Sequence, residues 1–513
     1  MQRLDTPAQA ASWLRARTGG NLSADSRQLG AGDGFIAWPG AKVDARRFVK
    51  AALAQGAGAC LVENEGLAAF DLDDARVAAY AGLKQDCGPI AAAYYEIPSD
   101  QLDVLAVTGT NGKTSTTWWL AQALSGLSQP IPCGLIGTLG VGQIGASGQL
   151  GAGLADTGLT TPDPVLLQAT LHRFVAQGLS ACAMEASSIG LAEHRLDGTR
   201  IRTAVLTNFT QDHLDYHVSM QAYWQAKQAL FDWPGLRAVV LNIDDEKGAE
   251  LAQQLRQRPL DLWTVSCKGK ARLQAKNIHL GARGLSFSVC EADECHPLSL
   301  RLAGEYNITN LLEVIASMRT LGVSLADAVQ SCHHLGPVPG RMELVEGDAS
   351  THNHLTLPMV VIDYAHTPDA LAQVLQALQP QASERGGQLW CVFGCGGDRD
   401  ASKRPLMGAI AARYAHRVVL TSDNPRSEKP EVIISQILLG LEGCSQVEVE
   451  PDRAQAIAQT LAQADANDLV LVAGKGHEAY QEVAGQRLPF SDHLEARKAL
   501  LAWPSNHQAG GRG

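Results

Sequence analysis

The sequence has no excess of positive charge, no C-x-x-C cysteine pair and no long apolar run. Its 513 residues include 42 Lys and Arg against 53 Asp and Glu, a formal net charge of −11, which argues against a nucleic-acid-binding surface as its main role. The eleven cysteines are scattered without a C-x-x-C pair. Neither a disulfide framework nor a structural zinc site is therefore predicted, and reduced thiols are expected.

Membrane and secretory signals are also missing. No apolar run approaches the roughly eighteen residues needed to cross a bilayer, and the N-terminal segment MQRLDTPAQAASWLRART lacks the apolar core of a signal peptide. We therefore expect a cytoplasmic protein without membrane insertion. A hydrophobic content of 45% with 50 Gly is typical of an α/β protein, and the length predicts roughly three domains.

A phosphate-binding loop is the strongest local signal. Residues 108–114 read TGTNGKT, directly after the apolar run 104–107 and before a segment that can begin a helix. This order points backbone N–H groups and the positive end of the helix dipole at a polyphosphate. Lys113 is predicted to reach the β- and γ-phosphates, and the Thr114 hydroxyl to bind Mg²⁺. The strict P-loop pattern has Gly where this chain has Val107. The alternative interpretation, an ordinary turn between strand and helix, would leave the Gly-Lys-Thr sequence unexplained.

Strand-like and helical patterns alternate along the chain, which predicts an α/β fold of three domains. The expected units are a small N-terminal α/β domain (1–100), a central domain (101–337) and a C-terminal Rossmann-like α/β domain (338–513). The central domain should be a P-loop-type mononucleotide-binding parallel sheet with helices on both faces. The second boundary lies at the segment GPVPG, because two prolines and two glycines cannot continue a helix or a central strand. The last residues, 506–513, are expected to be disordered.

Two central loops and one lysine could take part in metal chemistry. Glu185 follows a predicted strand, at the edge where α/β sheets bind ligands; a solvated loop glutamate is the alternative. The segment 207–217, TNFTQDHLDYH, packs two histidines and two aspartates into six residues after another strand, so it is metal-capable. Lys227 has mostly apolar neighbours, which fits either a partly buried lysine with a depressed pKa or a surface lysine with a covered stem.

Four motifs of the predicted C-terminal domain each follow a strand, so they should gather along one sheet edge. They are DYAHTP (363–368), GCGGDRD (394–400), SDNPRSE (422–428) and GKGHE (474–478). Arg399 and Arg426 could pair with carboxylates in forked geometry, while Asp423 and Glu478 could hold an ammonium group. The mixture suits a zwitterionic amino acid, although each motif alone could equally be a turn or a cap.

Taken together and in this order, the motifs resemble the Mur ligase family, the ATP-dependent amide-bond enzymes of peptidoglycan precursor synthesis. The resemblance covers nearly the whole chain. The segments that carry it are DSR (25–27), TGTNGKT, TTP (160–162), MEASS (184–188), TNFTQDHLDYH, the Lys227 helix, GEYNITN (304–310), PGRME (339–343), DYAHTPDAL, GCGGDRD, DNPR and GKGHE.

The resemblance implies a monomeric ligase that adds meso-diaminopimelate to UDP-N-acetylmuramoyl-L-alanyl-D-glutamate through an acyl phosphate, in cell-wall synthesis and hence cell shape and division. DNPR is the family's mark for diaminopimelate, because an arginine fork can hold the extra carboxylate. A lysine-adding ligase or a folylpolyglutamate synthetase is the nearest rival, and DNPR with DSR speaks against both. A nucleotide-binding regulator would need the P-loop but not GCGGDRD, DNPR and GKGHE.

The resemblance also implies site residues. Contacts to the UDP-muramoyl dipeptide are Ser26, Thr160, Thr161, Ser187 and Arg195. Contacts to ATP are Gly109, Thr110, Asn111, Gly112, Lys113, Thr114, Asn307, Asn310, Arg341 and Asp363. Contacts to diaminopimelate are Arg399, Asp423, Asn424, Pro425, Arg426, Gly474 and Glu478. Two Mg²⁺ ions would be bound by Thr114, Glu185, His213 and Lys227, the last modified to a carbamate by CO2. The implied catalytic residues are Lys113, Glu185, His213 and Lys227.

Three positions depart from the family pattern. Ile189 stands where many relatives have His, and Gln211 stands where Arg is common. The segment Ala41-Lys42-Val43 does not match the polar stretch that contacts the nucleotide in the family, so no contact is assigned there.

Overall fold

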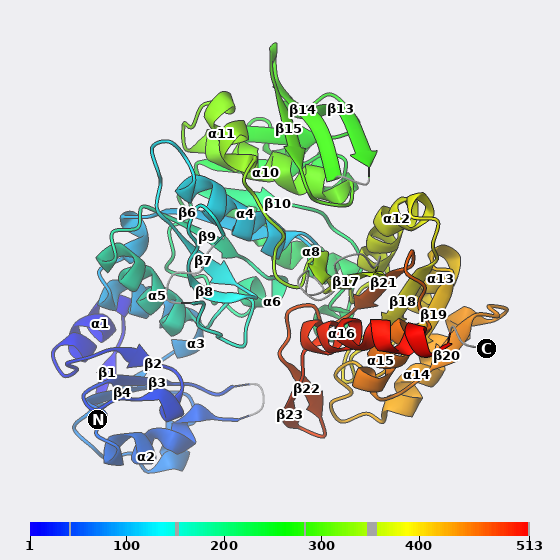
Figure 1. Cartoon of the computed structure of the whole chain (residues 1–513). Coiled ribbons are helices and arrows are strands. Elements are labelled where there is room, and N and C mark those ends of the chain that lie inside the picture. The colour runs from blue at the N-terminus through cyan, green and yellow to red at the C-terminus, as the bar shows by residue number, and fades with distance from the viewer. Residues whose placement is uncertain (41–42, 149–152, 282–283, 346–356, 511–513) are drawn as a thin grey trace.

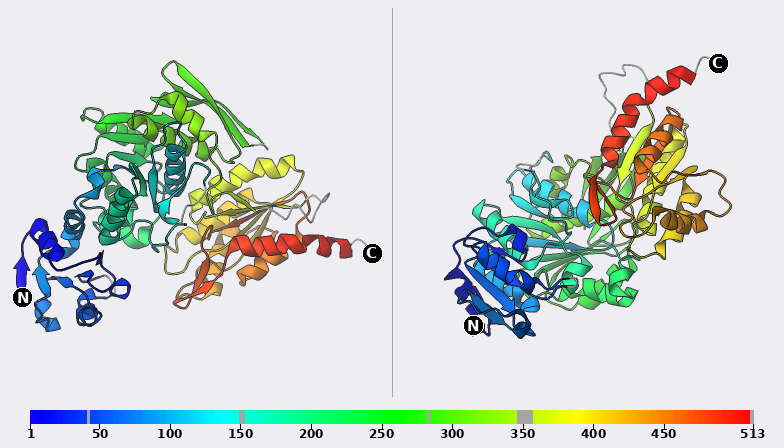
Figure 2. Two further views of the ribbon diagram at one scale, coloured as in Figure 1. Left: turned by 60° about the vertical axis from the view of Figure 1, so that its left-hand side comes forward. Right: turned by 90° about the horizontal axis from the view of Figure 1, so that it is seen from below.

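The computed structural model describes residues 1–40, 43–148, 153–281, 284–345 and 357–510. Of the departing segment at 41–43, residues 41 and 42 lie outside the described residues. Three sheets follow one another along the chain, within 2–80, 103–300 and 343–473, and form three units that Figures 1 and 2 show in succession from blue to red. The α/β fold is confirmed, while the boundaries at 100 and 337 remain predictions.

The N-terminal unit is a parallel sheet of order β1-β5-β4-β3-β2. Apolar clusters lie on both of its faces, as a parallel sheet requires. Its strands are β1 (Gln2–Leu4), β2 (Leu22–Ser23), β3 (Gly34–Ala37), β4 (Ala59–Glu63) and β5 (Val77–Tyr80), and its helices are α1 (Pro7–Arg15), α2 (Val49–Ala54) and α3 (Leu83–Tyr94).

The central unit is built on a ten-stranded sheet of order β15-β14-β13-β12-β11-β10-β6-β9-β7-β8. Its strands are β6 (Asp103–Thr108), β7 (Cys133–Gly137), β8 (Gly140–Gln143), β9 (Ala181–Glu185), β10 (Thr203–Leu206), β11 (Ala238–Asn242), β12 (Asp261–Ser266), β13 (Leu273–Gly281), β14 (Gly284–Glu291) and β15 (Glu294–Leu300). From β7 through β13 the neighbours are parallel, which confirms the predicted parallel core.

Helices cover both faces of this sheet. One apolar cluster joins the strands to α4, α10 and α11, and a second joins the opposite face to α5, α6 and α9. The helices are α4 (Lys113–Ser125), α5 (Pro164–Ala176), α6 (Ser188–Ala192), α7 (Leu214–His217), α8 (Met220–Gln228), α9 (Glu246–Leu255), α10 (Tyr306–Thr320) and α11 (Leu325–Cys332). Because β6 lies near the middle of the parallel core, its carboxyl end opens where ligands bind in such sheets.

The antiparallel edges were not predicted. β8 pairs antiparallel with β7, and β13, β14 and β15 form an antiparallel meander. In that meander Cys290 and Cys295 stand directly opposite each other and form a disulfide. The expectation of reduced thiols is therefore wrong for this pair, because the register of two adjacent strands, rather than sequence spacing, brings the sulfurs together.

The C-terminal unit is a six-stranded sheet of order β16-β17-β21-β18-β19-β20, parallel except for β16. Its elements are β16 (Glu343–Val345), β17 (Met359–Asp363), α12 (Pro368–Glu384), β18 (Leu389–Phe393), α13 (Lys403–Tyr414), β19 (Arg417–Leu420), α14 (Pro430–Leu438), β20 (Val447–Val449), α15 (Arg453–Gln463), β21 (Leu469–Ala473), the hairpin β22 (Tyr480–Val483) and β23 (Gln486–Pro489), and α16 (Asp492–Gly510). The expected disorder of the tail is wrong as far as Gly510, where α16 ends.

No helix among the described residues combines the length and the apolar character that crossing a bilayer requires.

Candidate active site

The loop between β6 and α4 depends on two glycines. Gly109 has φ +145° and Gly112 has φ +84°, a region that side chains rarely adopt. A Cβ on Gly109 would lie 1.8 Å from Oγ1 of Thr207, and one on Gly112 would lie 2.5 Å from Oδ1 of Asn310. The loop is thus packed directly against its neighbours, and α4 begins at Lys113, so its N-terminus faces the loop as a phosphate site requires.

The loop that follows β10 holds the phosphate loop in place. The backbone N–H of Thr110 donates to the carbonyl oxygen of Asn208 at 2.9 Å, and the N–H of Asn111 donates to Oδ1 of Asn208 at 2.9 Å. The hydroxyl of Thr207 donates to the carbonyl oxygen of Asn111 at 2.6 Å. The phosphate loop and the start of the 207–217 segment therefore form one bonded unit.

Lys113 and Lys227 meet at the same loop carbonyl. Nζ of Lys113 donates to the carbonyl oxygens of Gly109 at 2.9 Å and Thr110 at 2.8 Å, and Nζ of Lys227 donates to that of Gly109 at 2.6 Å. Lys227 is 1% exposed and lies over the ring of Tyr223. Burial, and then the charge of Lys113, hold the pKa of Lys227 well below its usual value. The surface interpretation of Lys227 is thereby excluded.

Glu185 ends β9 beside the phosphate loop. Its Oε2 accepts a 3.1 Å hydrogen bond from the hydroxyl of Thr114, and its Oε1 accepts a 2.8 Å bond from the backbone N–H of Thr138. The side chain is buried, so it is not a solvated loop glutamate. Nη2 of Arg341, from the segment that precedes β16, donates to the Thr114 hydroxyl at 3.1 Å.

The chemistry of these donors suits magnesium. Among the residues that the structure describes, no three His, Cys, Asp or Glu side chains are placed to share a metal ion. Mg²⁺ at a nucleotide site, however, needs only one or two protein oxygens beside phosphates and water. Thr114 and Glu185 provide such a pair of oxygens in direct contact.

His213, the third predicted ligand, lies beside Asp212, and its role at the metal remains a prediction. Its Nε2 lies 3.5 Å from Oδ2 of Asp212. Burial lowers the pKa of His213 to about 4, although the Asp212 charge opposes this. The ring is therefore neutral at physiological pH and has a free electron pair on one nitrogen.

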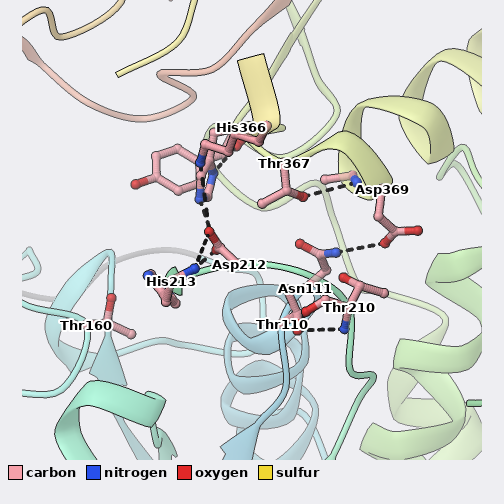
Figure 3. A network of polar contacts seen from close by, with 12 residues as sticks. Thr110, Asn111, Thr160, Thr210, Asp212, His213, His366, Thr367 and Asp369 are labelled. Atoms are coloured by element: carbon pink, nitrogen blue, oxygen red, sulfur yellow. Dashed lines mark hydrogen bonds and ion pairs between the residues drawn. The ribbon is translucent and has the colours of Figure 1, made fainter. Parts of the chain in front are cut away.

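Asp212 joins the central and C-terminal units, as Figure 3 shows. Its carboxylate lies 3.7 Å from Nε2 of His366 and 3.8 Å from Nζ of Lys403, in addition to its contact with His213. Burial opposes ionisation, but the contact with His366, together with the neighbouring His213 and Lys403, keeps the pKa of Asp212 well below its ordinary value. A second link is the 2.9 Å bond from Nδ2 of Asn111 to Asp369.

A cavity of about 430 Å³ opens beside the phosphate loop, between the two units. It is bounded by the phosphate loop, the ends of β11 and β12, the start of α10 and the first turns of α12. Sequence reasoning found Asn111, Gly112 and Asn310 but missed the rest of the lining. Polar residues at strand ends could have signalled part of it: Asn242, Asp244, Asp245 and Lys268.

The other residues assigned to ATP lie close by. Nδ2 of Asn307 donates to the carbonyl oxygen of Ala303 at 2.7 Å, which fixes the first turn of α10. Asp363 accepts backbone bonds from Met342 at 2.8 Å and Ala365 at 2.7 Å, so it holds the segment that carries Arg341. The guanidinium of Arg341 lies 4.3 Å from the centre of the Tyr364 ring.

Four of the five residues assigned to the muramoyl dipeptide cluster around Glu185. The Thr161 hydroxyl donates to the Glu185 carbonyl oxygen at 2.8 Å and to Oγ of Ser187 at 3.0 Å. Nη1 of Arg195 donates to the Thr161 carbonyl oxygen at 2.9 Å. Thr160 accepts a 3.0 Å bond from the Thr138 hydroxyl. The fifth, Ser26, is placed in the N-terminal unit, at the start of a 3-10 turn.

The residues assigned to diaminopimelate line the carboxyl ends of β18, β19 and β21. Nδ2 of Asn424 donates to Oε2 of Glu478 at 2.7 Å, and a Cβ on Gly474 would lie 2.4 Å from Oδ2 of Asp423. Lys475, which sequence reasoning missed, is fully buried and donates to Asn424 at 3.0 Å and to Glu478 at 2.9 Å. Pro425 precedes Arg426 in the same loop.

The side chains of Arg399 and Arg426 both approach Gly396. A Cβ on Gly396 would lie 2.9 Å from Nη1 of Arg426 and 3.7 Å from Cγ of Arg399. Arg399 is exposed and its Nη1 donates to the carbonyl oxygen of Asp398 at 3.2 Å. The structure thus brings two cationic side chains to one end of the cluster and two carboxylates, Asp423 and Glu478, to the other.

Comparison with protein families gives two matches that together span most of the chain. The Mur ligase middle domain matches residues 107–318. The Mur ligase, glutamate ligase domain matches residues 340–476.

Relatives and solved structures agree with these matches. The chain is 58% identical to a UDP-N-acetylmuramoyl-L-alanyl-D-glutamate--2,6-diaminopimelate ligase of Acidovorax sp. (strain JS42), over 98% of each protein. It is 44% identical to a ligase of the same name from Pseudomonas aeruginosa, over 95% of the chain and 96% of the relative. A solved structure of a ligase of that name superimposes with a TM-score of 0.62 at 34% identity, over 95% of each chain. MurF ligase from Thermotoga maritima in complex with ADP shares the fold, with a TM-score of 0.66 at 17% identity, over 96% of this chain and 99% of that one.

Proposed function

Because this chain belongs to the Mur ligase family, we propose that it joins 2,6-diaminopimelate to UDP-N-acetylmuramoyl-L-alanyl-D-glutamate in an ATP-dependent reaction. The chain is a ligase of peptidoglycan precursor synthesis. The observation that carries the substrate assignment is the 58% identity over 98% of both chains to a relative of that name. The phosphate loop, the cavity beside it and the arginine and carboxylate cluster of the C-terminal unit provide the three sites that such a reaction needs.

The reaction has two chemical steps. The γ-carboxylate of the D-glutamyl residue attacks the γ-phosphate of ATP, ADP leaves, and an acyl phosphate forms. The amine of diaminopimelate then attacks the acyl carbon, and phosphate leaves as the amide bond closes. A carboxylate is a poor electrophile until it is phosphorylated, so the enzyme must hold the carboxylate, the triphosphate and the amine in line, and electrostatic positioning supplies most of the rate.

Residues around the phosphate loop would offset the repulsion between the anionic nucleophile and the triphosphate. Lys113 is held at the start of α4, where its ammonium can exchange the Gly109 and Thr110 carbonyls for phosphate oxygens. Thr114 and Glu185 would hold Mg²⁺, which supplies positive charge at the transferred phosphoryl group when bound. Arg341 is bonded to Thr114 and so lies beside the same position.

We also propose that Lys227 is carbamylated. Its burial and lowered pKa favour a neutral amine, and only a neutral amine can attack CO2, with formation of an N–C bond and loss of one proton. The product is an anionic oxygen ligand of the kind that Mg²⁺ prefers. Intact-protein mass spectrometry at neutral pH with bicarbonate tests this: one added CO2 in the wild type and none in Lys227→Met is expected, and a wild-type protein at its unmodified mass would overturn it.

The acidic and the basic side chains of the amino-acid site would bind different groups of the substrate. Asp423, Asn424 and Glu478 would bind the ammonium end of diaminopimelate, while Arg426 and Arg399 would bind a carboxylate in forked geometry. Thr160, Thr161, Ser187 and Arg195 would contact the muramoyl dipeptide, because they cluster beside Glu185 and thus beside the phosphoryl group. Ser26 would contact the same substrate from the N-terminal unit.

One experiment tests the proposed function and its rivals together. The purified protein is incubated with ATP, Mg²⁺ and UDP-N-acetylmuramoyl-L-alanyl-D-glutamate, with meso-diaminopimelate or L-lysine in parallel, and the product mass is read. A tripeptide product with diaminopimelate alone is expected. Product with lysine alone would overturn the substrate assignment, and ATP hydrolysis that needs neither co-substrate would favour a nucleotide-binding regulator.

A further inference from the structure

The guanidinium of Arg426 is already partly occupied by a carboxylate of the chain itself. Its Nε lies 3.2 Å from Oε2 of Glu482, and its Nη1 donates a 2.7 Å hydrogen bond to the carbonyl oxygen of Gly397. The two side chains are 20% and 28% exposed, so the contact is partly shielded from water. A guanidinium binds a carboxylate best through two parallel N–H donors, and Glu482 takes one donor of that fork.

The main chain fixes this contact from both sides. The backbone N–H of Arg426 donates to the carbonyl oxygen of Glu482 at 3.0 Å, and the N–H of Ala484 donates to the carbonyl oxygen of Arg426 at 2.8 Å. The N–H of Glu482 donates to Oδ1 of Asn424 at 2.9 Å. The strand β22 therefore pairs with the loop that carries Arg426, and this pairing places the Glu482 side chain at the arginine.

The position of Glu482 beside Arg426 affects which amino-acid substrates the site can bind. A carboxylate at the far end of the substrate side chain would approach Arg426 and meet Glu482 at the same fork, where two carboxylates repel each other. An ammonium at that end would instead be attracted by Glu482. The same residue thus weakens the binding of a diacid amino acid and strengthens that of a diamine with one carboxylate.

We propose that Glu482 competes with the side-chain carboxylate of the incoming amino acid for Arg426, and so determines how strongly the site selects diaminopimelate over lysine. This inference rests on the proposed function. Substrate binding then exchanges one carboxylate partner of Arg426 for another, and the Glu482 carboxylate turns toward water. Arg399, whose side chain also approaches Gly396, remains available to the substrate carboxylate throughout the exchange.

The test is Glu482→Gln, which removes the charge and keeps the shape. Initial rates are measured with meso-diaminopimelate varied at saturating ATP and UDP-N-acetylmuramoyl-L-alanyl-D-glutamate. We expect the KM for diaminopimelate to fall by about two- to fivefold, the range for one partly exposed ion pair, with the KM for ATP unchanged. L-Lysine, tested as an inhibitor against diaminopimelate, should bind more weakly by a similar factor. A KM for diaminopimelate that stays constant or rises would overturn the proposal, because Glu482 would then only position Arg426.

Two controls separate the contact from a general charge effect. Glu448→Gln makes the same change on the edge strand β20, where Glu448 is 45% exposed and lies 4.0 Å from Arg417; it should leave the KM for diaminopimelate unchanged. In an Arg426→Met background, Glu482→Gln should no longer lower that KM, as a double-mutant cycle requires of a direct contact. An effect that persists without Arg426 would overturn the proposal.

The outcome is also separable from a failure of the proposed function. Wild-type protein that makes no product with either amino acid would refute the function. Wild-type protein that makes the diaminopimelate product, with an unchanged KM in Glu482→Gln, would refute only the inference about Glu482.

Discussion

The side-chain amide of Asn111 donates a 2.9 Å hydrogen bond to Oδ2 of Asp369, which ties the phosphate loop of the central unit to the first turn of α12 in the C-terminal unit. The amide of Gln373 donates to the same oxygen at 3.0 Å. Thr367 caps α12 by accepting from the N–H of Ala370, and Pro368 begins the helix, so the helix start is well defined. The charge of the half-buried Asp369 is thus met by two neutral amides.

Asp369→Asn should stabilise the protein at high pH only. Burial raises the pKa of Asp369 above 3.8, although both amides oppose this. An acid with a raised folded-state pKa lowers the free energy of unfolding as pH rises from its unfolded pKa through its folded pKa. We expect no change in Tm near pH 4 and an increase of about 1–2 °C at pH 8, measured by scanning calorimetry. A lower Tm in the variant at pH 8 would contradict this account.

Lys227→Met should separate stability from activity. The Lys227 side chain is fully buried over Tyr223, and methionine fills a similar volume without a desolvated amine. We expect the Tm to stay equal or rise, while the ligase rate falls by at least about a hundredfold, as for loss of a group that stabilises transition-state charge. Thermal unfolding and product mass measure the two effects. Lys498→Met, on the exposed surface of α16, is the control and should change neither.

His477→Gln should reduce the loss of folding stability that the protein undergoes as the pH falls from neutral to acidic values. Burial, and then the charge of Arg341, lower the pKa of His477 to about 4 from 6.5. The unfolded chain therefore binds a proton at a pH where the folded state does not, and the free energy of unfolding falls as pH drops from 6.5 toward 4. One such group contributes at most about 1.4 kcal/mol per pH unit. Denaturant unfolding at pH 5, 6 and 7 gives the free energy of unfolding at each pH, and this free energy should rise less steeply with pH in the variant than in the wild type. An equal rise in both proteins would refute the assignment.

Arg453 and Asp492 form a buried ion pair that supports the amino-acid site. Nε and Nη2 of Arg453 lie 2.7 and 2.8 Å from the two carboxylate oxygens of Asp492, and both side chains are fully buried. Nη2 also donates to the carbonyl oxygen of Ala473 at 2.9 Å, and Nη1 to that of Ser422 at 3.3 Å. These carbonyls directly precede the GKGHE loop and the DNPR loop.

Asp492→Asn should therefore destabilise the protein by about 3–5 kcal/mol, because it leaves a buried guanidinium without its counter-charge. Urea unfolding monitored by far-UV circular dichroism measures the change. The paired variant Arg453→Met with Asp492→Leu removes both charges and should recover most of the loss. A paired variant as unstable as Asp492→Asn would show that the bonds to Ser422 and Ala473, rather than the unpaired charge, dominate.

The sequence predicted the strands of the sheet interiors well. The apolar runs 203–206, 389–393 and 469–473 predict strands with the same bounds as β10, β18 and β21, because fully buried parallel strands are short apolar runs bounded by polar loops. The phosphate loop was also predictable, since its glycines, Lys113 and Thr114 are contiguous. The meander β13–β15 was missed because its strands alternate buried and exposed residues and carry polar side chains such as Lys276 and Glu294, which weakens the apolar signal.

Contacts between residues far apart in the sequence could not be predicted from local sequence patterns. Asn111 and Asp369 are 258 residues apart, and neither position has a local signal for the other. Lys475 lies between two glycines and resembles an exposed loop lysine, yet it is fully buried and bonded to the distant Asn424 as well as to Glu478 of its own loop. The same holds for Glu482 and Arg426, which only the pairing of β22 with the DNPR loop brings together.

The carbonyl of Gly109, which accepts hydrogen bonds from both Lys113 and Lys227, bears on inhibitor design. An uncharged acceptor placed at this position only replaces the acceptor that the backbone already provides, so its binding enthalpy gains little. A ligand needs a formal negative charge there to draw the Lys113 ammonium away from the carbonyl, because charge-assisted hydrogen bonds are about twice as strong as neutral ones. Neutral phosphate mimics should accordingly be poor nucleotide-competitive compounds for this enzyme, whereas small dianionic fragments should make better starting points.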